Sequence, residues 1–268
     1  MDPVQVNADG IAAHRDDTCL VIAFARPERL NAFTPAMMWE LVRLLQVGAD
    51  DPAVRAVVLT AEGDRAFCAG GDMVDANPAR PDEAYAADFT RVQRETTGRL
   101  YTYPKPLIGA FPGVIAGAGI GLALACPIRL GANGMRLVGA FARMEVTGDF
   151  GAPTLAARVL GQARAERLFL LDDRLDDIEC LDRGVVHRLM PVEELRPQAV
   201  ALAKQWGARS ALAFRGIVDN LHDSADLPFA QALDHEVSRQ LATSLSAEHA
   251  EAAHQFARQP TPKPDRGH

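Results

Sequence analysis

The sequence is poor in cysteine, and its few cysteines are not arranged for metal binding or for a disulfide framework. The four cysteines of the 268 residues are Cys19, Cys68, Cys126 and Cys180, with no CxxC pair and no Cys/His spacing that suits zinc. We therefore expect free thiols and no metal. The N-terminal MDPVQVNADG also lacks the basic start and apolar run of a signal peptide, so the expected location is the cytoplasm.

Lysine is scarcer still, and positive charge never gathers in a run. Lysine occurs only at Lys105, Lys204 and Lys263, all other cations being arginine, and the formal net charge is -7. Phosphate recognition along a nucleic acid usually requires a basic patch, which argues against a nucleic-acid partner. A small-molecule substrate is expected instead, and any anion would be bound by guanidinium groups or helix N-termini.

Long hydrophobic runs are also missing, apart from one uncharged stretch over residues 106–128. It contains Gly109, Gly113, Gly117 and Gly121 at the four-residue spacing of packed membrane helices, so a membrane span is one interpretation. Pro112 in mid-stretch and the high glycine content oppose it. We favour a buried strand at 107–111, a turn at 113–117 and a short helix at 118–126, hence no membrane partner.

The order of apolar patterns indicates an α/β core followed by a helical region. A hairpin is expected from 10–14 and 18–25, a helix opening at Thr34-Pro35, and a buried strand at 54–60. From residue 153 onward the periodicity is mostly helical. We therefore expect a core over 1–190, a helical region over 191–258 and a disordered tail over 259–268.

Two glycine-rich turns, at 67–72 and 113–119, each lie between an expected strand and an expected helix. Backbone N–H groups left without partners in such turns bind negative charge, and two that converge form an oxyanion hole, which stabilises the enolate of a thioester. The alternative is that these glycines only serve close packing. A dinucleotide-binding turn does not fit Gly117-Ala118-Gly119-Ile120-Gly121, because the third glycine comes one residue early.

Blocks of sequence resemble, in order and spacing, the signatures of the crotonase (enoyl-CoA hydratase/isomerase) superfamily. The resemblance covers residues 4–258 and implies a spiral of β-β-α turns, a helical C-terminal trimerisation region, and a homotrimer or a dimer of trimers. The blocks are Arg29-Leu30-Asn31-Ala32, Arg65-Ala66-Phe67-Cys68-Ala69-Gly70-Gly71-Asp72, Lys105-Pro106-Leu107-Ile108-Gly109-Ala110, Gly113-Val114-Ile115-Ala116-Gly117-Ala118-Gly119 and Leu160-Gly161-Gln162-Ala163-Arg164-Ala165.

Carried over to this sequence, the resemblance implies an acyl-CoA substrate and no cofactor beyond its coenzyme A moiety. The oxyanion donors would be the backbone N–H groups of Ala69 and Ala118. The 26–32 loop would lie against the coenzyme A nucleotide, with Arg26 and Arg29 as phosphate contacts or as solvated surface residues. The residues expected along the coenzyme A are Arg26, Arg29, Ala32, Ala69, Gly70, Gly71, Asp72 and Ala118, although Asp72 is also expected to cap a following helix.

The acidic residues depart from the family pattern. Hydratases of the family use two glutamates, whose positions here are Gly121 and Phe141, and neither can transfer a proton. Glu145 reaches the second position only through a gap in the alignment. Asp149 matches the position where dienoyl-CoA isomerases and 4-chlorobenzoyl-CoA dehalogenase carry a working aspartate; its alternative role is to cap the helix that follows Pro153.

These residues predict an acyl-CoA enzyme that works more like an isomerase than a hydratase. One carboxylate can take a proton from one carbon and return it to another, whereas hydration usually needs a second acid. Two alternatives stay open: another thioester reaction, such as hydrolysis, decarboxylation or dehalogenation, and a crotonase-type protein that binds acyl-CoA without turnover.

Overall fold

The computed structural model describes residues 6–8, 10–72 and 82–258 and divides into two compact units, one ending at Ala208 and the other beginning at Arg209. The expected boundary at residue 190 stays a prediction, and the division into compact units falls after Ala208. The helix α8 (Val192–Gly207) belongs to the first unit, because its buried Leu195, Ala199 and Ala203 pack against the main sheet. The stretch that leads to Pro81 and the tail after residue 258 lie outside the described residues.

The first unit contains two sheets to which successive strands contribute in turn. The seven-stranded sheet has the order β1-β2-β3-β4-β6-β8-β11, and the four-stranded sheet has the order β10-β9-β7-β5. The strands are β1 (Val6–Ala8), β2 (Ile11–Asp16), β3 (Cys19–Phe24), β4 (Ala56–Ala61), β5 (Ala66–Cys68), β6 (Leu107–Phe111), β7 (Val114–Ala116), β8 (Ile128–Ala132), β9 (Leu137–Val138), β10 (Arg174–Leu175) and β11 (Arg188–Met190).

The chain thus repeats a strand–strand–helix turn, which confirms the expected β-β-α spiral. The pairs β4-β5, β6-β7 and β8-β9 each add one strand to each sheet, in parallel with the previous turn, before helices follow. The helices of this unit are α1 (Pro35–Asp50), α2 (Glu83–Gln93), a π-helical turn (Arg94–Gly98), α3 (Arg99–Tyr101), α4 (Gly119–Leu124), α5 (Ala152–Leu160), α6 (Gln162–Leu170), α7 (Asp177–Asp182) and α8.

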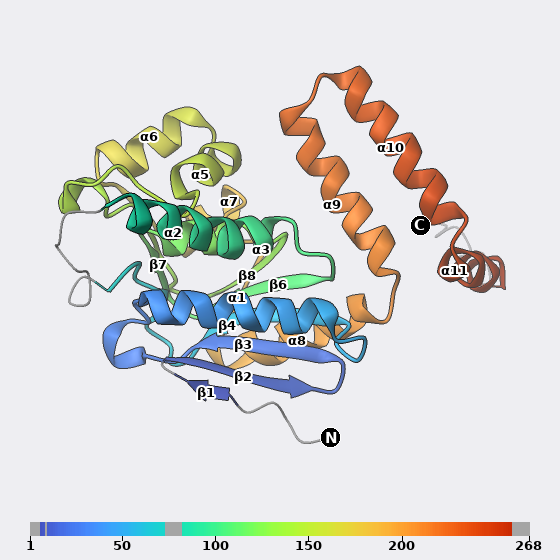
Figure 1. Cartoon of the computed structure of the whole chain (residues 1–268), viewed down its shortest axis with the longest axis horizontal. Helices are drawn as coiled ribbons and strands as arrows, with labels where there is room; N and C mark the ends of the chain where they lie inside the picture. The colour runs from blue at the N-terminus through green and yellow to red at the C-terminus, as the bar shows by residue number, and fades with distance from the viewer. Residues whose placement is uncertain (1–5, 9, 73–81, 259–268) are drawn as a thin grey trace, which may run out of the picture. The chain divides into compact units, whose positions relative to one another are not determined.

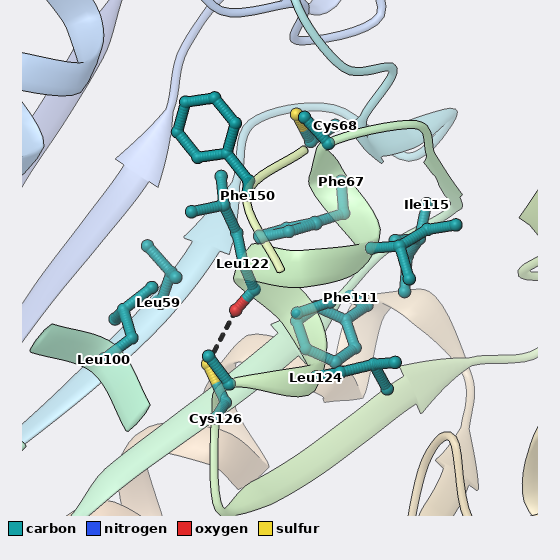
Figure 2. Close-up of a cluster of buried hydrophobic side chains, with 14 of the residues drawn as sticks. Leu59, Phe67, Cys68, Leu100, Phe111, Ile115, Leu122, Leu124, Cys126 and Phe150 are labelled. Atoms are coloured by element: carbon teal, nitrogen blue, oxygen red, sulfur yellow. Dashed lines mark hydrogen bonds between the residues drawn. The ribbon is translucent and has the colours of Figure 1, made fainter. Parts of the chain in front are cut away.

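Helices cover both faces of the large sheet, as Figure 1 shows for α1 and α8. Along β4, Val57 and Leu59 pack in the larger apolar cluster with α1, and Val58 packs in the smaller one with α8. Strands buried on both faces have no polar side, which explains their unbroken apolar runs. Figure 2 shows part of the larger cluster, where Phe67 and Phe111 meet edge to face, 4.8 Å between ring centroids.

The uncharged stretch 106–128 contributes β6, β7 and α4, nearly all of it buried. The strand expected at 107–111 is confirmed as β6, and the helix expected at 118–126 forms as the shorter α4. The turn expected at 113–117 instead contains the short strand β7. Glycine at 113 is required by space, because a Cβ there would overlap the main chain of Arg65. No helix within the described residues is long and apolar enough to cross a membrane.

Local signals near the N-terminus form as expected. Strands β2 and β3 pair as an antiparallel hairpin through Asp17, and Thr34 caps α1 by accepting the Met37 N–H, with Pro35 in the first helical position. Asp82 caps α2 in the same way. These caps satisfy N–H groups that the helices themselves leave without partners.

Lys105 lies where α1 ends and where two neighbouring parallel strands begin. Its ammonium donates to the carbonyl oxygens of Gly48, Asp51 and Val54 at 2.8, 2.7 and 2.8 Å. Partial burial of the ammonium lowers the pKa of Lys105. The three bonds use all three hydrogens of the ammonium.

The second unit consists of the helices α9 (Ala211–Asp226), α10 (Phe229–Ser244) and α11 (Ala247–Arg258), as the periodicity predicts. Ser210 caps α9, and Arg239 of α10 bonds both Asn220 and Asp223 of α9. Several apolar side chains of these helices stay exposed in the single chain: Leu212, Ile217, Leu221, Phe229, Leu233, Val237, Leu241, Leu245 and Phe256.

Candidate active site

The first glycine-rich turn follows β5, and most of its backbone N–H groups already have partners. The Ala69 N–H donates to the Leu30 carbonyl at 3.1 Å, the Gly70 N–H to the Cys68 sulfur at 3.4 Å, and the Asp72 N–H to the Phe33 carbonyl at 2.8 Å. Across residues 10–72 and 82–258, no acceptor is within hydrogen-bond reach of the Gly71 N–H. Gly71 is therefore the donor of this turn that a ligand can use.

The Ala69 N–H, the donor predicted from the sequence, is hydrogen bonded to Leu30 here, so Gly71 becomes a second candidate donor in this turn. Phe33 binds the residues on either side of Gly71, donating to the Gly70 carbonyl at 2.9 Å and accepting from Asp72. In a parallel ladder, a residue whose two neighbours are both hydrogen bonded to one strand directs its own N–H and C=O away from that strand. The Gly71 N–H thus points away from Phe33.

The second turn joins β7 to α4 and lies against the first. Gly117 adopts a left-handed conformation (φ 54°), and Ala118 is the N-cap of α4, so its N–H has no partner within the helix. Among the described residues its N–H meets no other acceptor. A Cβ built on Gly70 would lie 3.5 Å from the Ala118 N atom. The two glycine-rich turns are therefore in contact with each other.

The 26–32 loop is tied to the first turn by a buried carboxylate. Asp72 pairs with Arg26 and Arg29, each at 2.9 Å, and its side chain is 2% exposed. Asp72 therefore holds two arginines, and the helix that it is expected to cap would fall outside the described residues. Arg26 also donates to the Ala32 carbonyl at 3.1 Å, while Arg29, with its side chain 43% exposed, keeps access to solvent.

Asp149 lies in a turn between β9 and α5 that runs largely in left-handed conformations. The φ angles of Gly148, Phe150 and Gly151 are 98°, 49° and 72°. The N-cap of α5 is Gly151, and no side chain caps this helix, so the capping role considered for Asp149 is excluded. Burial raises the pKa of the Asp149 carboxyl, and a bond to its own backbone N–H opposes that shift.

The turn that carries Asp149 packs against α4 at Gly121, where the family resemblance places the first hydratase glutamate. A Cβ built on Gly121 would overlap the Phe150 carbonyl oxygen and would lie 3.1 Å from the Ala152 N atom. Phe141, where the resemblance places the second hydratase glutamate, is buried between the turn of Ala118 and the turn of Asp149. Its ring lies 3.9 Å from a Cβ built on Gly117 and 3.3 Å from one built on Gly148. Asp149 is thereby placed near the turn of Ala118.

Glu145, the other acidic candidate, is exposed, with φ 55° at the end of the 3₁₀ turn Ala142–Met144. Cys68 lies in the first turn, but complete burial raises the pKa of its thiol to about 12, so it is not a nucleophile near neutral pH. All four cysteines are free thiols, and no cluster of potential metal ligands occurs among the described residues.

Sequence reasoning missed one side chain at this site, Gln93 at the end of α2. Its Oε1 accepts the Phe150 N–H at 2.7 Å, across 57 residues of sequence. The local sequence does not indicate a role for this glutamine. The helix that contains it shows only an N-cap signal and an amphipathic pattern. Only the fold brings it to the Asp149 turn.

Comparison with known proteins agrees with this architecture. The model of the enoyl-CoA hydratase/isomerase family matches residues 14–263. The 1,2-epoxyphenylacetyl-CoA isomerase of Escherichia coli is 31% identical, over 94% of this chain and 97% of that protein, and the crotonyl-CoA hydratase of Syntrophomonas wolfei is 26% identical, over 77% and 79%.

Solved structures give the same result. The crystal structure of an enoyl-CoA hydratase from Polaromonas sp. JS666 superposes with a TM-score of 0.86 at 27% identity, covering 94% of this chain and 98% of that one. The family match spans both glycine-rich turns and the Asp149 turn. This chain belongs to the enoyl-CoA hydratase/isomerase family.

Proposed function

We propose that this protein is an acyl-CoA enzyme that stabilises a thioester enolate and moves a proton with one carboxylate. The N–H groups of Gly71 and Ala118 hold the thioester oxygen, and Asp149 is the acid/base. The observation that carries the proposal is the placement of a half-buried carboxyl, with a raised pKa, in a turn packed against the helix that Ala118 begins.

The reaction proceeds by proton transfer. The ionised Asp149 takes a proton from a carbon next to the thioester carbonyl, and the negative charge moves to the thioester oxygen, where two N–H donors stabilise it. The protonated Asp149 then returns the proton to another carbon of the acyl chain. Substrate and product have the same composition, so this is an isomerisation, and it requires no cofactor beyond the coenzyme A of the substrate.

One relative and two residues of this chain support this chemistry over hydration. The 31% identical Escherichia coli protein is an isomerase that acts on an acyl-CoA. The hydratase glutamate positions are occupied here by Gly121 and Phe141, which cannot hold or deprotonate water. We therefore propose an acyl-CoA isomerase, with 1,2-epoxyphenylacetyl-CoA and enoyl-CoA thioesters as the first substrates to assay.

The coenzyme A moiety is proposed to lie along the 26–32 loop and the 69–72 turn. Arg29 is the phosphate contact in this proposal, because its side chain is the more exposed of the two arginines that pair with Asp72. The assembly is proposed to be a homotrimer or a dimer of trimers, supported by the exposed apolar side chains of α9, α10 and α11.

The comparison of Asp149→Asn with Glu145→Gln tests the proposal. We expect Asp149→Asn to lower turnover by ~10²-fold or more and to leave acyl-CoA affinity within a few-fold, because the oxyanion donors are main-chain groups. Glu145→Gln should leave both unchanged, since Glu145 is exposed. Turnover and binding are measured on the same acyl-CoA. Loss of activity in Glu145→Gln alone would transfer the acid/base role to Glu145.

A further inference from the structure

The turn that carries Asp149 takes its shape from residues outside it. Gln93 accepts the N–H of the peptide that joins Asp149 to Phe150 at 2.7 Å, and the Asp149 carbonyl accepts the Ala152 N–H at 2.9 Å. On the other side, the Phe150 carbonyl oxygen occupies the space that a side chain at position 121 would need. The backbone of Asp149 is therefore held from α2 and from α4.

This support matters because the turn is built from conformations that side chains disfavour. Phe150 is left-handed at φ 49° although it carries a bulky side chain, and it lies between the left-handed Gly148 and Gly151. Such a conformation persists when the surroundings determine it. The Phe150 ring is buried and packs edge to face on Phe33 and Phe89, with ring centroids 5.1 and 6.0 Å apart.

We infer that Gln93 and Gly121 are positioning residues that aim Asp149 at the substrate, an inference that rests on the proposed function of Asp149. Gln93 fixes the peptide that follows the acid, and Gly121 leaves room for the turn to approach α4. A side chain at position 121, the glutamate of the hydratases included, competes with the Phe150 carbonyl for one space. In this chain a glutamate at position 121 would therefore require the Asp149 turn to shift.

The Gln93 side of the inference is tested by two substitutions of similar length. Gln93→Met removes the acceptor, so kcat should fall by about 10- to 100-fold with KM within a few-fold, because a small displacement of a catalytic group costs that much. Gln93→Glu keeps an acceptor and should recover most of kcat. It also places a negative charge one peptide away from Asp149, so the acidic limb of the pH–rate profile should move to higher pH. Recovery of kcat in Gln93→Glu, beside its loss in Gln93→Met, distinguishes a positioning acceptor from a side chain that only fills space.

The Gly121 side is tested by Gly121→Ala with Gly98→Ala as its control. The added methyl must displace the Asp149 turn, and kcat should fall by about 100-fold. Gly98 is also helical, but it is exposed, and a Cβ there would meet its nearest atom, the Gln93 carbonyl oxygen, at 3.9 Å. Gly98→Ala should keep kcat within a few-fold of the wild type.

The outcomes separate this inference from the proposed function. If Asp149→Asn keeps wild-type turnover, the proposed function fails and the inference fails with it. If Asp149→Asn is inactive while Gln93→Met and Gly121→Ala keep the wild-type kcat and pH profile, only the positioning role is overturned. Should Gly121→Ala fail to fold, the two Gln93 variants decide.

Discussion

Asp149 ionises in surroundings that disfavour its charge, and this has an effect on stability that is separate from catalysis. Burial raises the pKa of its carboxyl in the folded protein above the ordinary value of 3.8. The folded state therefore binds the proton more tightly than the unfolded state does. The ionised carboxylate destabilises the fold above its folded pKa, and this destabilisation disappears as the pH falls below 3.8.

Asp149→Asn should accordingly be more stable than the wild type at neutral pH. The amide has no charge to desolvate, so we expect Tm at pH 7 to rise by on the order of 1–4 °C, and the difference to vanish towards pH 4. Thermal unfolding of both proteins between pH 4 and pH 8 measures this. A lower Tm for Asp149→Asn at pH 7 would mean that the carboxylate makes a stabilising contact in the folded protein.

The identity of the main-chain donors shows where sequence reasoning stopped at the residue scale. The pattern of glycines located both turns, but it could not tell which N–H of the first turn was already bonded. That depended on Leu30 and Phe33, which reach the turn from a loop more than 30 residues earlier. Gln93 depended in the same way on a contact that spans 57 residues.

At the scale of elements, the 26–33 loop and the 69–72 turn form one hydrogen-bonded unit. Three backbone bonds, from Ala69 to Leu30, Phe33 to Gly70 and Asp72 to Phe33, join them, and the Asp72 carboxylate adds two ion pairs. One buried negative charge thus lies between the guanidinium groups of Arg26 and Arg29. An ion-pair partner of this kind is not visible in the sequence, where Asp72 resembles a helix cap.

The helix α10 presents an apolar stripe that predicts self-association. The exposed residues Phe229, Leu233, Val237, Leu241 and Leu245 recur every four positions along one face. Because a monomer rarely leaves such a stripe in water, we expect light scattering to give three or six times the chain mass of 28.9 kDa. Leu241→Glu should lower that mass towards a single chain.

The matched control is Gln240→Glu, which adds the same charge to the neighbouring exposed position, about 100° around the helix. This variant should keep the wild-type mass. A wild-type mass of one chain, or equal masses for both variants, would remove α10 from the interface.

For the molecule as a whole, the proposed assignment of the two hydratase glutamate positions to Gly121 and Phe141 predicts feeble hydration of crotonyl-CoA. One general acid/base group typically contributes ~10²–10⁴-fold, so replacement of two should be plain in an ultraviolet assay of the conjugated thioester. The proposed isomerisation depends on Asp149 alone and should continue. Hydration at the rate of an ordinary hydratase of the family would show that Glu145 or Asp149 activates water after all.

Most of the fold could be predicted from sequence, because the spiral repeats a short-range signal. The strands around β4 and β6 appear as apolar runs, and the glycines mark the turns that follow β5 and β7. The division into compact units after Ala208 could not be predicted. The periodicity of α8 shows that one face is covered, but whether the sheet or another helix covers it depends on tertiary packing.

The hydrogen bonds of Lys105 bear on how neighbouring strands of the large sheet are aligned. Parallel strands are not joined by a tight turn that fixes how far one strand is shifted along the next. Here the ammonium binds the end of α1 and the residue two positions before β4, while its own main chain enters β6 two residues later. A single cation thus links the end of one helix to the starts of two neighbouring strands.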